Sequence, residues 1–444
     1  MTTSLADDRE SPEIGRAMHG FITDLYPICR SITGEGVRET LRKIGARIPL
    51  EIVEVPTGTA VFDWSIPKEW NIRDAYIKNG RGERIVDFRN SNLHVLNYSV
   101  PVHRKVSRAE LSEHVFTLPD RPEWIPYRTS YYKENWGFCI SHRLWEGMDE
   151  AEYEVCIDSS LAAGFLTYGE CFLRGETDEE VLLSCHICHP SLCNDNLSGV
   201  ALATFLAEAL GRIRTRYSYR FLFIPGTIGA IAWLHRNEAG VGRIRHGLVI
   251  ACVGVPGPFT YKKSRRGNSG IDAAVVHVLG HSGREHQIRD FTPYGYDERQ
   301  YCSPGFNLPV GALSRTPHGE YPEYHTSEDN LDLVRPAALA ESLRIAQSVI
   351  EVLEKNRRYR NLNPKCEPRL GARGLYSSIG GRADIKTMEF ALLWVLNYSD
   401  GRHTLLDIAE RSGYPFGRIS EAAELLAGHG LLEECCLEKE VTST

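Results

Sequence analysis

The sequence predicts an α/β protein built on a mixed, mostly parallel sheet flanked by helices, with a small β-rich insertion domain and a helical C-terminal domain. In the middle of the chain, apolar strand-like runs alternate with a helix-like stretch at 199–212. The runs are found at 181–184, 219–224 and 248–253. Strands that alternate with helices form parallel sheets covered by helices, and such sheets bind ligands at the carboxyl ends of their strands.

The N-terminal segment is expected to be helical. Its apolar spacing from 14 to 44 predicts two helices interrupted at Tyr26 and Pro27, because proline disfavours a continued helix. Between them lies the loop CRSITGEGV, which carries Arg30 and Glu35. These side chains could face a ligand, or the loop could simply cap the second helix.

Two further changes of pattern divide the chain into three predicted domains. Short alternating runs broken by Pro, Gly and Asn predict a β-rich insertion at 50–126. The α/β domain is then expected to comprise 1–49 and 127–363, and a linker and winged helix the remaining residues 364–444. The winged helix is predicted from the order of three helices and a strand-like tail, at 386–398, 403–412, 415–429 and LLEECCL.

Composition restricts the function classes. A net charge of -7 and a pI near 6.2 argue against a protein that coats nucleic acid or an anionic membrane. The N-terminus has no apolar signal region, and no segment reaches the roughly 18 apolar residues of a membrane span. We therefore expect a cytoplasmic protein without membrane partners, whose 12 cysteines are thiols.

The stretch SCHICHPSLCNDNLSG follows the first apolar run and is the first candidate metal site. His186 ends the predicted strand, and Asp195 precedes a helix from which its carboxylate can reach back to the histidine. Imidazole and carboxylate together suit zinc. The competing interpretation is that a pair of histidines near a strand end arises by chance.

A second loop, RTPHGEYPEYHTSEDN at 315–330, supplies further candidates. It is dense in imidazole and carboxylate groups: His318, Glu320, Glu323 and His325. Some polar groups after His325 are expected to cap the following helix instead.

Taken together, this order of motifs resembles the zinc aminopeptidases of the M28 type. More closely, the chain resembles the bacterial aminopeptidase-like family with an inserted β domain and a C-terminal winged helix, known as DUF4910 and DUF2172. Seven stretches carry the resemblance in order: YPICRSITGEG, VFDWSIPKEWNIRDAYI, NSNLHVLNYSVPVH, IPYRTSYYKENWGFC, SCHICHPSLCNDNLSG, YDERQYCSPGFNLPVG and PHGEYPEYHTSED.

The resemblance implies a zinc aminopeptidase-like fold and a set of site residues. It implies that His186, Asp195 and His325 are metal ligands, with Asp195 in the bridging position of two-zinc enzymes. It also implies that Arg30 and the segment 297–301 line the substrate end of the cleft, which makes Glu298, Arg299 and Tyr301 candidates for substrate binding. We add His318 to these candidates.

Two positions depart from the family pattern. The general base of the family is usually a glutamate in a motif of the form PETIGS, where this chain has Gly226. Relatives also carry an aspartate ligand after the next strand, and Val255 stands in its place. We therefore expect a single zinc ion, with His189 or Cys188 as a substitute ligand and Glu320, Glu323 or Asp297 as the base.

Three functions stay open at this point. The first is a zinc-dependent hydrolase that cleaves an amide bond of a small peptide or an amine-bearing metabolite. The second is a degenerate or repurposed binding or biosynthetic protein on the same fold. The third is a winged-helix regulator, which the acidic C-terminal domain disfavours: from Lys386 onward it holds five Lys or Arg against ten Asp or Glu. We expect no nucleic acid partner and leave room for a homo-oligomer.

Overall fold

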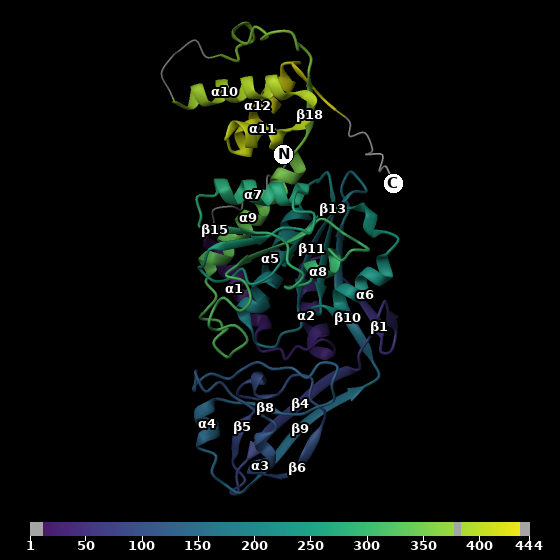
Figure 1. The fold of residues 1–444 in the computed structure, drawn as a ribbon, viewed down its shortest axis with the longest axis vertical. Helices are drawn as coiled ribbons and strands as arrows, with labels where there is room; N and C mark the ends of the chain where they lie inside the picture. Colours follow the sequence, from purple (N-terminus) through teal and green to yellow (C-terminus); the bar gives the residue numbers. More distant parts are fainter. Residues whose placement is uncertain (1–11, 377–382, 436–444) are drawn as a thin grey trace. The chain divides into compact units, whose positions relative to one another are not determined.

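A computed structural model describes residues 12–376 and 383–435 of the chain (Figure 1). It divides into two compact units. The first comprises the described residues up to 269 together with 285–344, and the second comprises 270–284 and the described residues from 345 onward. None of the helices within the described ranges is both long and apolar enough to cross a membrane.

The first unit is built on an eight-stranded mixed sheet. Its strands, in spatial order, are β1 (Glu51–Pro56), β10 (Phe165–Leu173), β12 (Ser218–Ile224), β11 (Glu180–His186), β13 (Ile244–Ile250), β16 (Val310–Arg315), β14 (Phe259–Lys262) and β15 (His286–Arg289). Pairing is parallel between β12 and β11, β11 and β13, β13 and β16, and β14 and β15, and antiparallel at the other three neighbours. The predicted mostly parallel sheet is therefore confirmed.

Helices cover this sheet as the periodicity predicted. Helix α1 (Pro12–Leu25) ends just before Tyr26, and α2 (Glu35–Gly45) follows the glycine-containing loop. Helix α5 (Ser198–Leu210) packs on β11 and on α1, while α2 and α6 (Ile228–Asn237) pack on β10. The short α8 (Glu298–Tyr301) and the long α9 (Pro336–Lys355) complete the helices that flank the site. Strand β11 is buried along its whole length, as expected of a central parallel strand.

The β-rich insertion contains a second, four-stranded antiparallel sheet. Its order is β5 (Arg84–Asp87), β4 (Glu69–Lys78), β9 (Glu152–Ala162) and β6 (Val102–Ser107). Two short pairs accompany it: β2 (Ala60–Val61) with β3 (Trp64–Ser65), and β7 (Val115–Phe116) with β8 (Phe138–Cys139). The sheet differs from the predicted 50–126 segment at both ends, because β1 pairs within the large sheet and β9 lies beyond residue 126.

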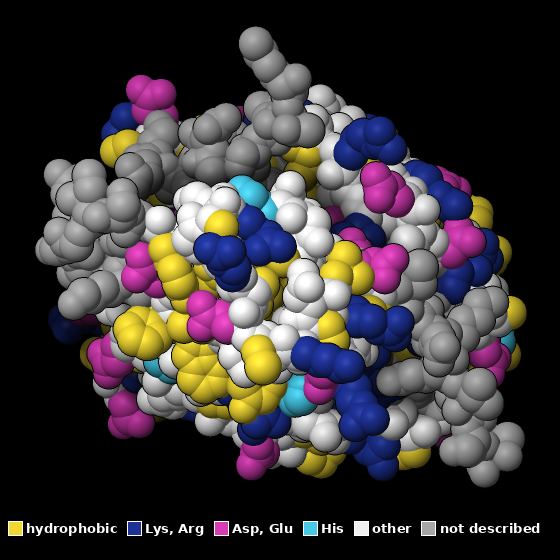
Figure 2. Space-filling view, turned by 90° about the horizontal axis from the view of Figure 1, so that it is seen from above, with side chains coloured by type: hydrophobic (Ala, Val, Ile, Leu, Met, Phe, Trp, Pro, Cys, Tyr) yellow, Lys and Arg dark blue, Asp and Glu magenta, His cyan; other side chains and the backbone are white. Residues whose placement is uncertain are grey.

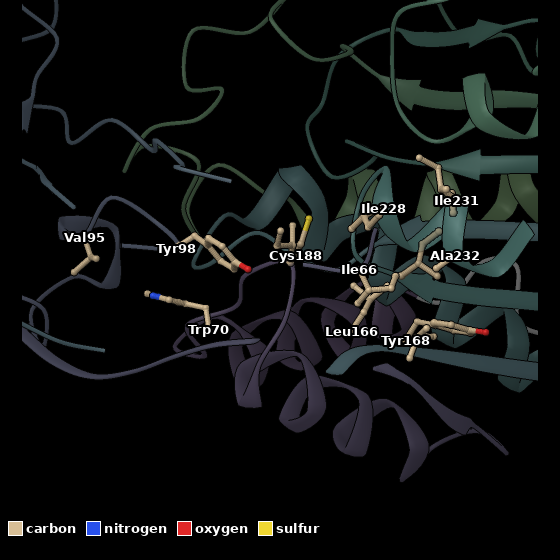
Figure 3. Packing of buried hydrophobic residues seen from close by; sticks show 14 of the residues in the cluster. Ile66, Trp70, Val95, Tyr98, Leu166, Tyr168, Cys188, Ile228, Ile231 and Ala232 are labelled. Carbon is tan, nitrogen blue, oxygen red and sulfur yellow. The ribbon is translucent and has the colours of Figure 1, made fainter. Parts of the chain in front are cut away.

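One continuous core joins this insertion to the large sheet (Figure 3). Trp70 of β4 and Tyr98 lie in the same buried cluster as Leu166 and Tyr168 of β10. Cys188, which follows β11, belongs to the cluster as well. The loops at the carboxyl ends of the central strands are therefore packed from the insertion side.

The second unit is a winged helix together with α7 (Gly270–His281) and the part of α9 from Ile345 onward. It contains β17 (Arg358–Asn361), α10 (Ala383–Tyr398), β18 (Asp400–Thr404), α11 (Leu405–Ser412), α12 (Phe416–Gly428) and β19 (Leu432–Glu434). Strand β17 pairs antiparallel with β18 and β19, and Thr404 and Asp407 form a capping box that starts α11. The three predicted helices are confirmed, whereas the last two residues of the predicted tail LLEECCL lie outside the described residues.

The surface and the cysteines agree with the composition. Basic, acidic and hydrophobic side chains are intermixed on the face that Figure 2 shows. On α12, Arg418 pairs with Glu421 at 3.2 Å. Eleven cysteines fall within the described ranges, and all are free thiols.

Candidate metal centre

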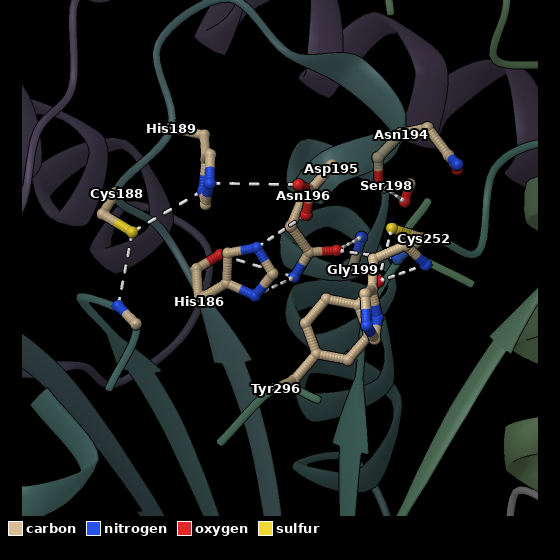
Figure 4. A network of polar contacts seen from close by, with 12 residues as sticks. His186, Cys188, His189, Asn194, Asp195, Asn196, Ser198, Gly199, Cys252 and Tyr296 are labelled. Atoms are coloured by element: carbon tan, nitrogen blue, oxygen red, sulfur yellow. Dashed lines mark hydrogen bonds and ion pairs between the residues drawn. The ribbon is translucent and has the colours of Figure 1, made fainter. Parts of the chain in front are cut away.

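Three imidazoles surround one buried carboxylate at the carboxyl end of β11. Figure 4 shows two of them, His186 and His189, beside Asp195. Asp195 lies in the irregular turn η2 (Cys193–Leu197) and is 1% exposed. Its Oδ1 lies 2.8 Å from Nε2 of His186, and its Oδ2 lies 3.0 Å from Nε2 of His325. Nε2 of His189 is 3.9 Å from the same Oδ2. The ligand atoms of His186, His189 and Asp195 lie within 4.8 Å of one another, so the cluster can hold one metal ion.

The charges of the cluster follow from this arrangement. Burial would raise the pKa of Asp195, but the surrounding imidazoles outweigh it and hold the pKa well below its usual range. Burial lowers the pKa of His189 to about 3, which keeps this imidazole neutral. For His186, burial acts to lower the pKa and Asp195 overcomes it, so the pKa is raised. An ionised carboxylate beside a neutral imidazole provides the lone pairs that a metal needs.

Side-chain amides fix the turn that carries Asp195. Oδ1 of Asn196 accepts the backbone N–H groups of Gly199 and Cys252, at 3.2 and 3.1 Å. Oδ1 of Asn194 accepts the backbone N–H of Gly254 at 2.9 Å. Through these bonds, the segment after β13 holds the turn at the end of β11. The sequence therefore builds the site from two neighbouring strand ends, as parallel sheets commonly do.

Asp329 supports the same turn from the His-rich loop. Its carboxylate accepts the backbone N–H groups of Asn194 and Asp195, at 2.5 and 3.0 Å, and the hydroxyl of Tyr321 at 3.2 Å. Asp329 is 0% exposed, and burial is the main reason that its pKa is raised to about 7. Sequence reasoning treated this residue as part of a helix cap, and no local signal separates that role from a support for Asp195.

Replacing Asp329 with alanine is expected to destabilise the protein and to weaken metal retention. Each buried N–H left without a partner costs about 1–3 kcal/mol of unfolding free energy. Urea unfolding followed by tryptophan fluorescence measures the first effect, and elemental analysis the second. The half-buried neighbour Glu328, changed to alanine, is the control. An unchanged unfolding midpoint in Asp329→Ala would show that the two N–H groups find other partners.

His325 is held in place by residues 125–127, which lie between β7 and β8. It has a φ of 56°, in the left-handed region that few non-glycine residues occupy. Its ring stacks on Tyr324, with centroids 3.9 Å apart, and its carbonyl accepts the backbone N–H of Tyr127 at 2.8 Å. Ile125 and Ser327 exchange two further bonds, at 2.8 and 3.1 Å.

The three predicted bases lie in different surroundings. Asp297 is 2% exposed, and its Oδ1 accepts the backbone N–H of Thr227 at 2.6 Å. Burial raises its pKa to about 6, against the opposing effect of His186. Glu320 instead forms an ion pair with Arg289 on the surface, and Glu323 is half-buried two residues before His325.

The predicted substrate-binding residues also separate into two groups. Arg30 and Tyr301 are buried and bonded within the protein: Arg30 Nε donates to the carbonyl of His189 at 2.8 Å, and the Tyr301 hydroxyl contacts Ser184 Oγ at 2.9 Å. The structure gives both of them a supporting position. Arg299 donates to Thr227 Oγ1 at 3.3 Å, whereas Glu298 and His318 line a separate pocket.

Gly226 lies at the edge of the cluster. Its N–H donates to Cys188 Sγ at 3.3 Å, and a Cβ built there would lie 3.6 Å from that sulfur and 3.7 Å from Cβ of His186. These are ordinary contact distances, so the position has room for a side chain directed at the metal cluster. Val255, at the other departing position, is 6% exposed and offers no ligand atom.

Tyr296 is a site residue that sequence reasoning missed. Its ring stacks on His186 with centroids 5.5 Å apart and planes 18° apart. Its hydroxyl contacts Cys252 Sγ at 3.0 Å and accepts the backbone N–H of His318 at 3.0 Å. The one available signal was its position directly before Asp297 in the motif YDERQYC.

Fold and site together define an aminopeptidase-like protein. A zinc aminopeptidase from Bacillus subtilis shares the fold with a TM-score of 0.56 and 11% identity, over 76% of this chain and 95% of its own. The chain belongs to the family described as a domain of unknown function, DUF4910, whose model matches residues 19–356. Residues 357–434 match a winged helix-turn-helix model.

Two similar proteins come from Clostridium acetobutylicum. One is named "Putative polysaccharide biosynthesis protein with aminopeptidase-like domain" and is 54% identical over 94% of this chain and 96% of its own length. The other is a crystal structure described as a "putative peptidase", with 51% identity and a TM-score of 0.92 over 97% of this chain and 98% of that one. The predicted family, fold class and winged helix are confirmed.

Proposed function

We propose that this protein is a metal-dependent hydrolase that cleaves an amide bond in a small peptide or an amine-bearing metabolite. The observation that carries the proposal is the convergence of His186, His189 and His325 on the buried carboxylate of Asp195. His186, His189 and Asp195 place their ligand atoms within 4.8 Å of one another, and two imidazoles with one carboxylate are a donor set that zinc accepts. Three protein donors leave one position open for substrate, and His325, which contacts Asp195 Oδ2, is a further candidate donor. The residues present therefore fit one zinc ion.

Side chains of this protein would take different parts in the hydrolysis. Zinc, when bound, supplies a Lewis acid that polarises the carbonyl of the amide. Asp297 would act as the base. Its carboxylate accepts the N–H of Thr227, which follows Gly226 in the chain, and Gly226 stands where the resemblance implies a glutamate. Tyr296 stacks on His186 and so fixes the plane of that imidazole. Asp297 would take a proton from the water molecule that attacks the carbonyl carbon, and would give that proton to the leaving amine as the C–N bond breaks.

A second candidate function is a diverted reaction in the same cleft. The chain has Gly226 and Val255 at the two positions where the resemblance implies acidic residues, and one relative is named for polysaccharide biosynthesis. Both observations favour a substrate other than an ordinary peptide. We give the winged helix a packing role in place of nucleic acid binding, because Arg418 on α12 is paired with Glu421.

Elemental analysis of the purified protein tests the proposal. We expect about one zinc per chain, and loss of the metal in His186→Ala, because this change removes one of the three residues whose ligand atoms lie within 4.8 Å of one another. His103→Ala is the matched control, since the His103 side chain is 67% exposed and lies in β6 of the insertion. Wild-type protein that takes up no zinc after dialysis against the metal would contradict the proposed function.

A further inference from the structure

A pocket of about 230 Å³ lies beside the metal centre. Residues of β14 and β16 form part of its lining, and the loops around Tyr294 and His318 form the rest. Tyr296 belongs to both sites: it lines the pocket and stacks on His186. A group bound in the pocket is therefore one aromatic ring away from the metal cluster.

Of the two cations in this pocket, Lys262 has no free hydrogen-bond capacity, whereas Arg289 uses three of its five donors. The Lys262 ammonium donates to the carbonyls of Thr292 and Tyr294, at 3.4 and 2.8 Å, and forms an ion pair with Glu298. An ammonium has three donors, so all of them are engaged. Arg289 is held by both carboxylate oxygens of Glu320 and also by Gln287.

The hydrogen-bond acceptors of the pocket, by contrast, have few hydrogen-bond partners. Glu298 is 0% exposed, and neither carboxylate oxygen receives a hydrogen bond apart from the ion pair with Lys262. A carboxylate offers about four lone-pair sites, so most of its capacity is open. Nδ1 of His318 is also buried without a partner, and burial lowers the pKa of this histidine. The pocket therefore has buried acceptor atoms that lack hydrogen-bond donors.

Aromatic rings provide the walls around these acceptors. The ring of His318 lies 4.9 Å from that of Tyr296 and 5.5 Å from that of Tyr294. The Tyr294 side chain is 71% exposed, although large aromatic side chains are usually buried. Aromatic faces attract cations, and a desolvated carboxylate attracts them more strongly.

We propose that this pocket binds a primary ammonium group of the substrate, carried on a short alkyl or sugar-like arm. Glu298 would accept hydrogen bonds from the ammonium, and Tyr294 and Tyr296 would face its alkyl carbons. This inference rests on the proposed function, because it names the class of substrate that the neighbouring metal centre would act on. Substrates of this class carry a basic group at a distance from the amide that is cleaved.

Calorimetric titration of the full-length protein with n-butylamine at pH 7.5 tests the proposal, with 1-butanol as the neutral comparison. We expect the ammonium form to bind and the alcohol to bind at least 10-fold more weakly. Glu298→Gln should weaken ammonium binding by about 10- to 100-fold, the range for a hydrogen bond to a charged group. Tyr294→Ala, which changes an exposed side chain, should weaken it by about 2- to 5-fold.

Two control variants separate this effect from a general loss of structure. Glu180→Gln alters another buried, ion-paired glutamate, and Tyr132→Ala alters another exposed tyrosine, and both should bind the amine as the wild type does. Equal binding of amine and alcohol, tighter binding of butyrate, or no binding of the amine would overturn the proposal. Zinc content measured on the same samples distinguishes the two proposals: a protein without zinc that binds the amine contradicts only the hydrolase.

Discussion

Replacing Gly226 with glutamate in a protein whose Asp297 is changed to asparagine is expected to raise hydrolysis of leucine p-nitroanilide by about 100-fold. A Cβ at this position would lie 3.6 Å from Cys188 Sγ and 3.7 Å from His186 Cβ, which are ordinary contact distances. A positioned general base contributes about 10²–10⁴ to the rate, so even an imperfect placement should be measurable. The release of p-nitroaniline, followed by absorbance in zinc-loaded protein, gives the result directly.

Gly226→Gln is the matched control, because it has the same size as Gly226→Glu and cannot act as a base. A gain in Gly226→Glu that is absent in Gly226→Gln would identify the added carboxylate as the cause of the faster hydrolysis. No gain in either variant, with zinc content unchanged, would favour the diverted reaction over an ordinary amide hydrolase.

Changing Asp297 to asparagine is expected to reduce hydrolysis by about 10²–10⁴, the contribution of a general base. Asparagine keeps the size of the side chain and can still accept the Thr227 N–H, so the local fold should be retained. Zinc content should stay at the wild-type value, because Asp297 does not contribute to the cluster of His186, His189 and Asp195. A lower kcat with little change in KM would place the effect of the substitution in the chemical step.

Two further variants sharpen the assignment of Asp297. Glu320→Gln removes a predicted base that the structure places in a surface ion pair with Arg289, and it should leave kcat within about threefold of the wild type. The double variant Gly226→Glu with Asp297→Asn should recover activity if the two carboxylates serve the same purpose. An Asp297→Asn protein as active as the wild type would remove Asp297 from the mechanism.

Local patterns were sufficient for the elements that carry the site. The apolar run before His186, the helical spacing after Asp195 and the break at Pro27 each depend on neighbours in the sequence. The corresponding elements are β11, α5 and the end of α1. The convergence of the 184–199 and 315–330 segments was expected from the resemblance to the zinc aminopeptidases of the M28 type, and not from any local pattern.

Other features depend on contacts between distant residues, which no local pattern encodes. Strand β9 joins the insertion sheet by pairing with β4, about 80 positions earlier in the chain. Arg30, predicted to face substrate, is used internally because its guanidinium meets the His189 carbonyl within the buried core. Asp329 could not be distinguished from a capping residue, since its partners at Asn194 and Asp195 are more than 130 positions away.

The hydrogen bonds that Ile125 and Tyr127 make to Ser327 and His325 limit how this protein can be shortened. The β-rich segment looks like a removable module, and its excision would seem to leave a smaller catalytic core. Residues 125–127 of this segment, however, hold the loop that carries His325 through backbone hydrogen bonds. A shortened protein that kept every candidate donor residue would therefore lose the support of His325. Grafting this centre onto another scaffold would require residues 125–127 to be carried along with it.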